Sequence, residues 1–201
     1  TPEAGLSYRG PWLIFAAQGR AGGASQQSIF AVNADGTGLT RLVDGRASGL
    51  SPSPASARLA YVGDGAAAPG GLALKLVQLP GGQVQTAAGL LPPGFPPASS
   101  LATGDDAWQV LQAVQSQEPR WSADADHIVY VGAADGPTAD VYLFNLFTWT
   151  AVRLSDEEGQ AVNPRWSPDE RVVAYGVKRD LQTGPAERVD EVRLAWTNGS
   201  G

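Results

Sequence analysis

Residues 118–131 read Glu-Pro-Arg-Trp-Ser-Ala-Asp-Ala-Asp-His-Ile-Val-Tyr-Val, and residues 163–176 read Asn-Pro-Arg-Trp-Ser-Pro-Asp-Glu-Arg-Val-Val-Ala-Tyr-Gly. Both stretches contain Pro-Arg-Trp-Ser, then a short polar turn, then a run of β-branched and aromatic residues. Internal repetition at a fixed period indicates that one structural unit is stacked several times. The two stretches therefore predict two copies of the same unit.

The pattern extends towards the N-terminus. The stretch that begins at Ser53 fits it without a gap, and the stretch that begins at Ser7 fits it more loosely. We call Ser7, Ser53, Ser122 and Ser167 the anchor serines; they are separated by 46, 69 and 45 residues. This spacing predicts four repeats of about 45 residues, the third of them preceded by an insert.

The second half of each repeat reads as a β-hairpin. Asp35 and Gly36 separate two apolar runs at 29–32 and 39–42, and Asp-Gly is a strong hairpin signal because glycine tolerates a positive φ. Similar hairpins are expected at 74–85 and 141–154, whereas the run 192–196 reaches Thr197-Asn198-Gly199 and there the chain stops. Each repeat thus predicts four antiparallel strands, of which the last repeat lacks its outer one.

Several strands are apolar on both faces, as at 13–15 and 128–131. Such a sheet must be covered on both sides, and stacked neighbouring sheets do this. We therefore predict an all-β fold, a β-propeller of four-stranded antiparallel blades with four blade units visible, and we expect the tryptophan of the motif to be buried between blades. Two β-sandwich domains would not need the same register four times.

The expected domain is a single propeller domain or segment with blade units at about 3–46, 47–88, 118–157 and 162–201 and an insert at 89–117. In the insert, Pro-rich residues 91–97 should be extended, and a short helix should follow Asp105-Asp106. Its expected apolar face contains Ala107, Val110, Leu111 and Val114. Two interpretations stay open: the insert is a lid packed on a blade, or Phe95 and Trp108 bind a partner.

Composition limits the possible functions. The chain has 20 acidic and 14 basic residues and a formal net charge of −6, which disfavours nucleic-acid binding. It contains no cysteine, so disulfides and thiolate metal sites are excluded, and no apolar run approaches the ~18 residues of a membrane span.

No catalytic, cofactor-binding or metal-binding residue is predicted. His127 is the single histidine, and it stands where the expected turn enters the second strand of its repeat, a position that accepts any side chain. The chain has no Gly-x-Ser-x-Gly motif. Its acidic residues lie in expected turns and lack the spacing of a calcium-binding loop.

Trp166-Ser167-Pro168-Asp169, the strand that follows, and the Asn33–Thr37 hairpin resemble the TolB-type (WD-like) β-propeller repeat family. The chain departs from that pattern in Glu170, where glycine is usual, and in Ala123, which replaces proline. The resemblance implies a propeller, commonly exported, of a kind found in periplasmic translocation proteins, lipoproteins and prolyl-oligopeptidase-like peptidases. The absence of cysteine also fits a periplasmic, secreted or lipid-anchored bacterial protein.

Arg120 and Arg165 recur beside the motif tryptophans on the expected innermost strands. They could form a cationic girdle that captures a carboxylate at the channel mouth, or they could stack on tryptophan or pair with an acid of the next blade. The favoured function is a non-catalytic scaffold that binds a protein or peptide partner at a propeller face or the central channel. The alternatives are a gating propeller of a larger peptidase, with its catalytic domain outside this chain, and a small-ligand site in the channel with or without Ca²⁺.

Four visible blade units are compatible with three arrangements of the propeller. Further blades could belong to a larger propeller, which we favour; four blades could close into a small ring; or the open blade faces could meet a partner, including a second copy of the chain.

Overall fold

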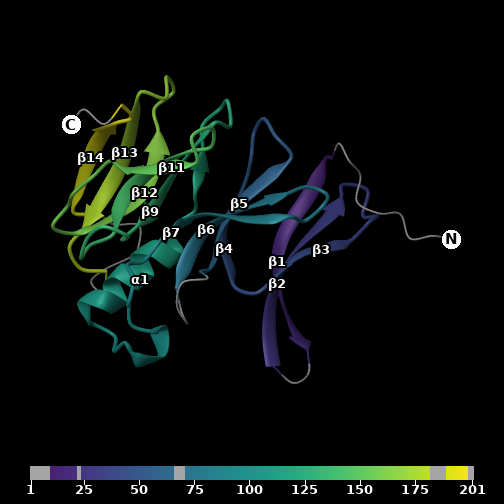
Figure 1. Cartoon of the computed structure of the whole chain (residues 1–201), viewed down its shortest axis with the longest axis horizontal. Helices are drawn as coiled ribbons and strands as arrows, with labels where there is room; N and C mark the ends of the chain where they lie inside the picture. The colour runs from purple at the N-terminus through teal and green to yellow at the C-terminus, as the bar shows by residue number, and fades with distance from the viewer. Residues whose placement is uncertain (1–9, 22–23, 66–70, 182–188, 199–201) are drawn as a thin grey trace.

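A computed structural model of the 201-residue chain describes residues 10–21, 24–65, 71–181 and 189–198. Four antiparallel sheets stand side by side in chain order, from the purple end to the yellow end of Figure 1. Sheet 1 contains β1 (Trp12–Ala21), β2 (Ala24–Asn33) and β3 (Thr40–Asp44); sheet 2 contains β4 (Ala47–Pro52), β5 (Arg58–Asp64), β6 (Leu72–Gln78) and β7 (Val84–Gly89). Sheet 3 contains β8 (Arg120–Trp121), β9 (His127–Gly132), β10 (Asp140–Asn145) and β11 (Thr150–Arg153); sheet 4 contains β12 (Gln160–Trp166), β13 (Val172–Lys178) and β14 (Glu191–Trp196). The predicted all-β propeller architecture is confirmed.

Within the described residues, sheets 1 and 4 have three strands each. For sheet 4 this agrees with the prediction that the last repeat lacks its outer strand. Sheet 4 ends with β14, after which the hairpin of the other repeats is not completed, and the strand expected around Ser7 lies outside the described residues. The sheets form an open stack, so of the three arrangements considered the small closed ring of four blades is excluded.

The anchor serines occupy equivalent positions in three sheets. The backbone N–H of Ser53 donates to the carbonyl of Arg58, that of Ser122 to His127, and that of Ser167 to Val172, at 2.8–2.9 Å. In the turns between, Ala125 and Glu170 have φ values of 62° and 58°. Glycine is the residue that adopts this conformation at least cost, which explains why the TolB-type repeat usually carries it at the position of Glu170.

Three apolar clusters fill the spaces between successive sheets. Ile29 and Leu59 belong to the cluster between sheets 1 and 2, and Val129 and Val173 to the cluster between sheets 3 and 4. Ile128, the neighbour of Val129 in the same strand, faces the cluster between sheets 2 and 3. Each fully buried side chain of this size contributes roughly 1.5–3 kcal/mol. Alternate residues of β9 thus hold sheet 3 to both of its neighbours.

The two motif tryptophans join successive sheets by the same hydrogen bond. The indole N–H of Trp121 donates to the carbonyl of Ser51 at 2.8 Å, and that of Trp166 to the carbonyl of Arg120 at 3.0 Å. Both acceptors lie two residues before an anchor serine. Trp121 is buried as expected, but Trp166 is only half-buried, because it lines a pocket that opens between sheets 3 and 4.

The insert contains η1 (Ala98–Ser100) and α1 (Asp106–Ser116), the one α-helix within the described ranges. The predicted helix is confirmed: Val110, Leu111 and Val114 are buried, whereas Ala107 is half-buried. The helix contacts β4, β9 and β12 and takes the place of the first part of an inner strand, since β8 has two residues where β12 has seven. No helix formed by the described residues has the length and apolar character needed to cross a membrane.

The C-terminal end of α1 is bonded to two non-adjacent sheets. The hydroxyl of Ser48 in β4 donates to the carbonyl of Gln115 at 3.0 Å, and the backbone N–H of Asn163 in β12 donates to Oε1 of Gln117 at 2.7 Å. Both strands have an irregularity there, with positive φ at Gly49 (59°) and Asn163 (53°). The helix therefore links sheet 2 directly to sheet 4.

Candidate functional site

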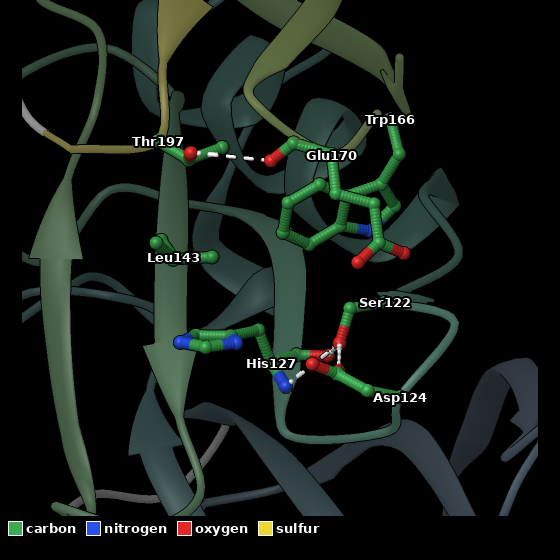
Figure 2. Close-up of a pocket in the computed structure, with 7 residues that line it drawn as sticks. All are labelled: Ser122, Asp124, His127, Leu143, Trp166, Glu170 and Thr197. Carbon is green, nitrogen blue, oxygen red and sulfur yellow. Dashed lines mark hydrogen bonds between the residues drawn. The ribbon is translucent and has the colours of Figure 1, made fainter. Parts of the chain in front are cut away.

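A pocket of about 190 Å³ lies between sheets 3 and 4 (Figure 2). Its lining residues come from the motif turns of both sheets and from β10 and the end of β14: Ser122, Asp124, His127, Leu143, Trp166, Glu170 and Thr197. The pocket therefore contains a serine, an aspartate and the single histidine of the chain, the residue types of a hydrolase triad.

The hydrogen bonds do not connect these groups as a catalytic triad would. The hydroxyl of Ser122 donates to Oδ1 of Asp124 at 2.6 Å and accepts the backbone N–H of His127 at 2.9 Å. Figure 2 shows the imidazole pointing away from that hydroxyl. Its Nε2 lies 3.0 Å from Nδ2 of Asn145, an amide donor. An activated nucleophile needs a base within hydrogen-bond reach. The His127 imidazole makes no hydrogen bond to the Ser122 hydroxyl and is not placed to act as its base.

The same bonds occur in sheet 4 without any histidine. The hydroxyl of Ser167 donates to Oδ1 of Asp169 at 2.6 Å and accepts the backbone N–H of Val172 at 3.1 Å. Ser122 and Asp124 thus form the same turn as Ser167 and Asp169. The hydrogen bonds of Ser122 and Asp124 are therefore explained by the turn of the repeat.

Both turn aspartates should titrate below the ordinary range of the residue. The serine hydroxyl, followed by a backbone N–H, lowers the pKa of Asp124 and that of Asp169. Because each folded-state pKa is depressed, the contribution of each turn to stability is present at neutral pH and is lost as the pH falls through that pKa. NMR titration of the carboxyl carbons should show that Ser167→Ala raises the pKa of Asp169 and leaves that of Asp124 unchanged. An unchanged Asp169 pKa would contradict this account.

Metal binding has no support from the arrangement of side chains. Across the described ranges, no group of three or more His, Asp or Glu side chains could hold a metal ion.

The structure brings Arg120 and Arg165 together on neighbouring inner strands, β8 and β12. Arg120 pairs with Glu118 at 2.7 Å. Arg165 donates to the carbonyl of Pro164 at 2.8 Å, but it has no carboxylate partner within the described part of the chain. Burial, and then the positive charge of Arg120, lowers the pKa of the Arg165 guanidinium. Of the two arginines, only Arg120 therefore pairs with a carboxylate in the described part of the chain.

Phe95 and Trp108 do not join this arginine pair. Phe95 is half-buried, packs against the cluster between sheets 2 and 3, and lines an apolar cavity of about 390 Å³ beside the Pro-rich stretch. Trp108 is half-buried on α1, outside the buried residues of that helix. The cavity beside Phe95 is lined by residues of the insert and of sheets 2 and 3, and Trp108 is not among them.

Sequence reasoning missed two residues that bond to the strands of the arginine pair, Glu118 to Arg120 of β8 and Gln117 to Asn163 of β12. Glu118 stands at the motif position of Asn163, and this substitution of an acid for an amide is a signal that the sequence contained. Gln117, which bonds to Asn163, had no such signal because its role depends on where α1 ends.

Comparisons with known proteins agree with the architecture. No family model matches the chain. The Tol-Pal system protein TolB of Alcanivorax borkumensis is 33% identical over 79 residues, which is 37% of this chain and 18% of that protein. TolB from Acinetobacter baumannii has a TM-score of 0.55 at 15% identity over 87% of this chain and 36% of that one.

A peptidase propeller is also similar. The β-propeller domain of the Trilobed protease from Pyrococcus furiosus, described as having an open velcro topology, gives a TM-score of 0.61 at 13% identity and covers 98% of this chain and 56% of that one. The chain thus spans less than two thirds of each of these three proteins. At these identities the solved structures show the shared fold.

Proposed function

Because the chain has the TolB-type β-propeller fold, we propose that it is a non-catalytic scaffold that binds a protein or peptide partner outside the cytoplasm. The contact would lie on the innermost strands of sheets 3 and 4, where Arg120 and Arg165 would bind a carboxylate of the partner. The similarity to TolB proteins supports the location, because propellers of the TolB type are commonly exported, and the absence of cysteine is compatible with it.

The observation that carries this proposal is the incomplete neutralisation of the arginine pair. Glu118 supplies one carboxylate to Arg120, and Arg165 is left with a backbone carbonyl as its acceptor among the described residues. The surplus positive charge is local, since the chain as a whole has a net charge of −6. A guanidinium binds a carboxylate through two parallel hydrogen bonds, so an acidic side chain or a C-terminal carboxylate of a partner fits this position.

Peptide binding tests the proposal. A fluorescein-labelled peptide with several glutamates and a free C-terminus should bind, and an amidated peptide with glutamines in their place should not. Arg165→Glu should weaken binding of the acidic peptide by about 10–100-fold, because a hydrogen bond to a charged group contributes about 1.5–3 kcal/mol. Fluorescence anisotropy gives both dissociation constants.

Arg58→Glu is the matched control. Arg58 is exposed at the start of β5, donates to Gln78, and has no carboxylate partner among the described residues, so the charge change is the same at a different place. Its dissociation constant should stay within a factor of about two of the unmutated value. Equal weakening by both variants would indicate non-specific charge attraction, and failure of the acidic peptide to bind would contradict the proposal.

An accessory propeller of a larger peptidase is the second candidate. The similarity to the propeller domain of the Trilobed protease over 98% of this chain favours it. A Gly-x-Ser-x-Gly motif encoded downstream of Gly201 would support this candidate, because that motif positions the nucleophile of prolyl-oligopeptidase-like catalytic domains.

The open faces of the end sheets offer a second type of contact, which we also propose. Leu13 and Phe15 are exposed on sheet 1, and Val192, Leu194 and Trp196 are exposed on sheet 4, with Leu194 at 69%. Apolar faces of this kind are covered by the next blade between the inner sheets of this chain. Further blades or a second copy of the chain would cover them in the same way.

A further inference from the structure

Three tyrosines occupy the same place in the repeat, eight residues after an anchor serine: Tyr61, Tyr130 and Tyr175. Tyr175 donates its hydroxyl to Oε1 of Glu157 at 2.6 Å, and Glu157 lies in the connection that leads into the sheet of Tyr175. Tyr61 is 1% exposed, and its hydroxyl has no hydrogen-bond partner among the residues that the structure describes. A buried hydroxyl without a partner is unusual in a native fold and calls for an explanation, such as a bound water or ion.

Tyr61 lines a cavity of about 300 Å³ between sheets 1 and 2. Its other polar lining residues are Arg46, Lys75, Asp44 and Asp64, and aliphatic side chains of β3 and β7 complete the wall. Tyr61 and Lys75 are directly opposed in the β5–β6 register, so both side chains lie on the same face of the sheet.

Gly63 allows these groups to converge. A Cβ atom at Gly63 would lie 2.8 Å from Cε2 of Tyr61 and 3.2 Å from both the Arg46 carbonyl and Cδ of Lys75. A real Cβ would therefore collide with the tyrosine ring, and glycine keeps the ring, the lysine stem and the Arg46 backbone close together. The glycine at this position of β5 thus allows the three groups to lie close together.

Both carboxylates of this cavity already accept bonds from the fold. Asp44 accepts the hydroxyl of Ser28 at 2.9 Å and pairs with Arg41 at 3.1 Å. Asp64 accepts the backbone N–H of Arg46 at 3.2 Å. Within the described ranges, the Lys75 ammonium and the Arg46 guanidinium have no carboxylate partner.

We propose that the cavity between sheets 1 and 2 binds a small carboxylate, which accepts hydrogen bonds from the Tyr61 hydroxyl and the Lys75 ammonium, with the Arg46 guanidinium at the entrance. One carboxylate oxygen takes the place that Glu157 occupies for Tyr175. Burial, and then the charge of Asp64, raises the pKa of Tyr61 to about 12, so the phenol stays protonated and can donate at neutral pH. This site is separate from the arginine pair on the inner strands.

Thermal unfolding of the chain with sodium acetate or sodium succinate, compared with sodium chloride at equal ionic strength, tests the site. The carboxylates should raise Tm in a saturable way, by about 5–10 °C at a hundredfold excess over Kd. Tyr61→Phe should abolish this shift. Without carboxylate, the same variant should have a Tm equal to that of the unmutated protein or about 2–4 °C higher, because it removes a buried hydroxyl without a partner.

Tyr175→Phe is the matched control at the equivalent position. It breaks a hydrogen bond that the fold itself supplies, so its Tm should fall by about 2–4 °C while the carboxylate shift is kept. Lys75→Met should remove the carboxylate shift, and Arg165→Glu should keep it, which separates this site from the proposed partner site. The proposal is overturned if carboxylates raise Tm no more than chloride does, or if Tyr61→Phe keeps the shift.

Discussion

Trp121→Ala should lower the free energy of unfolding by about 3–5 kcal/mol, the usual range for truncation of a large buried aromatic residue. Trp121 is 8% exposed and packs in the cluster shared by sheet 2, α1 and sheet 3. Its indole N–H also satisfies the carbonyl of Ser51, which would lose this bond. Urea denaturation followed by tryptophan fluorescence and circular dichroism gives the change in the midpoint and in the free energy.

The equivalent tryptophan of sheet 4 provides the comparison. Trp166 makes the same type of hydrogen bond, to Arg120, but it is half-buried, so Trp166→Ala should cost clearly less than Trp121→Ala. Trp121→Phe keeps most of the apolar volume and removes the N–H. Its loss of unfolding free energy should therefore lie between those of Trp166→Ala and Trp121→Ala. If Trp166→Ala were as costly as Trp121→Ala, burial in the cluster would not be the source of the effect.

Gly49→Ala should destabilise the chain by about 2–5 kcal/mol, through left-handed strain and overpacking. The φ of Gly49 is +59°, and an added Cβ would lie 2.5 Å from the carbonyl oxygen of Gln117 and 3.0 Å from Cα of Glu118. Both neighbours are backbone atoms and cannot rotate away. The segment between α1 and β8 would have to shift, which would also disturb the bond from Gln117 to Asn163.

Gly36→Ala separates the two causes. Gly36 has a φ of +83°, but an added Cβ meets nothing within 4 Å, so only the conformational cost of about 1–2 kcal/mol applies. Asn163→Gly, at the corresponding irregularity of β12, should be close to neutral because glycine tolerates the φ of 53°. Equal losses for Gly49→Ala and Gly36→Ala in urea denaturation would contradict the predicted collision with Gln117.

The repeat could be predicted because its signals are local. The anchor serines, the Asp-Gly hairpin and the two-faced apolar strands each follow from residues within one unit, and Ser53, Ser122 and Ser167 form the same backbone bond. The position of α1 could not be predicted from its apolar face, because such a face can pack against the apolar surface of any sheet. The end of the helix contacts the strand irregularities at Gly49 and Asn163, which lie far from it in the sequence and which no local pattern predicts.

For the arginine pair, the strand positions could be predicted from the sequence, but the ion pairing could not. The repeat register places Arg120 and Arg165 on adjacent inner strands, and the structure brings them together. Which acid pairs with which arginine depends on loop geometry, and Glu118 serves one of the two. The difference between Tyr61 and Tyr175 has the same origin, because the equivalent tyrosines differ only in whether an incoming loop offers an acceptor.

A stack of repeats ordinarily behaves as a one-dimensional chain in which each module senses only its immediate neighbours. The bonds from α1 to Ser48 and to Asn163 break that rule, because they couple the second and fourth modules across the third. The second and fourth modules are therefore coupled directly as well as through the third, whereas the described contacts hold the first module to its immediate neighbour alone.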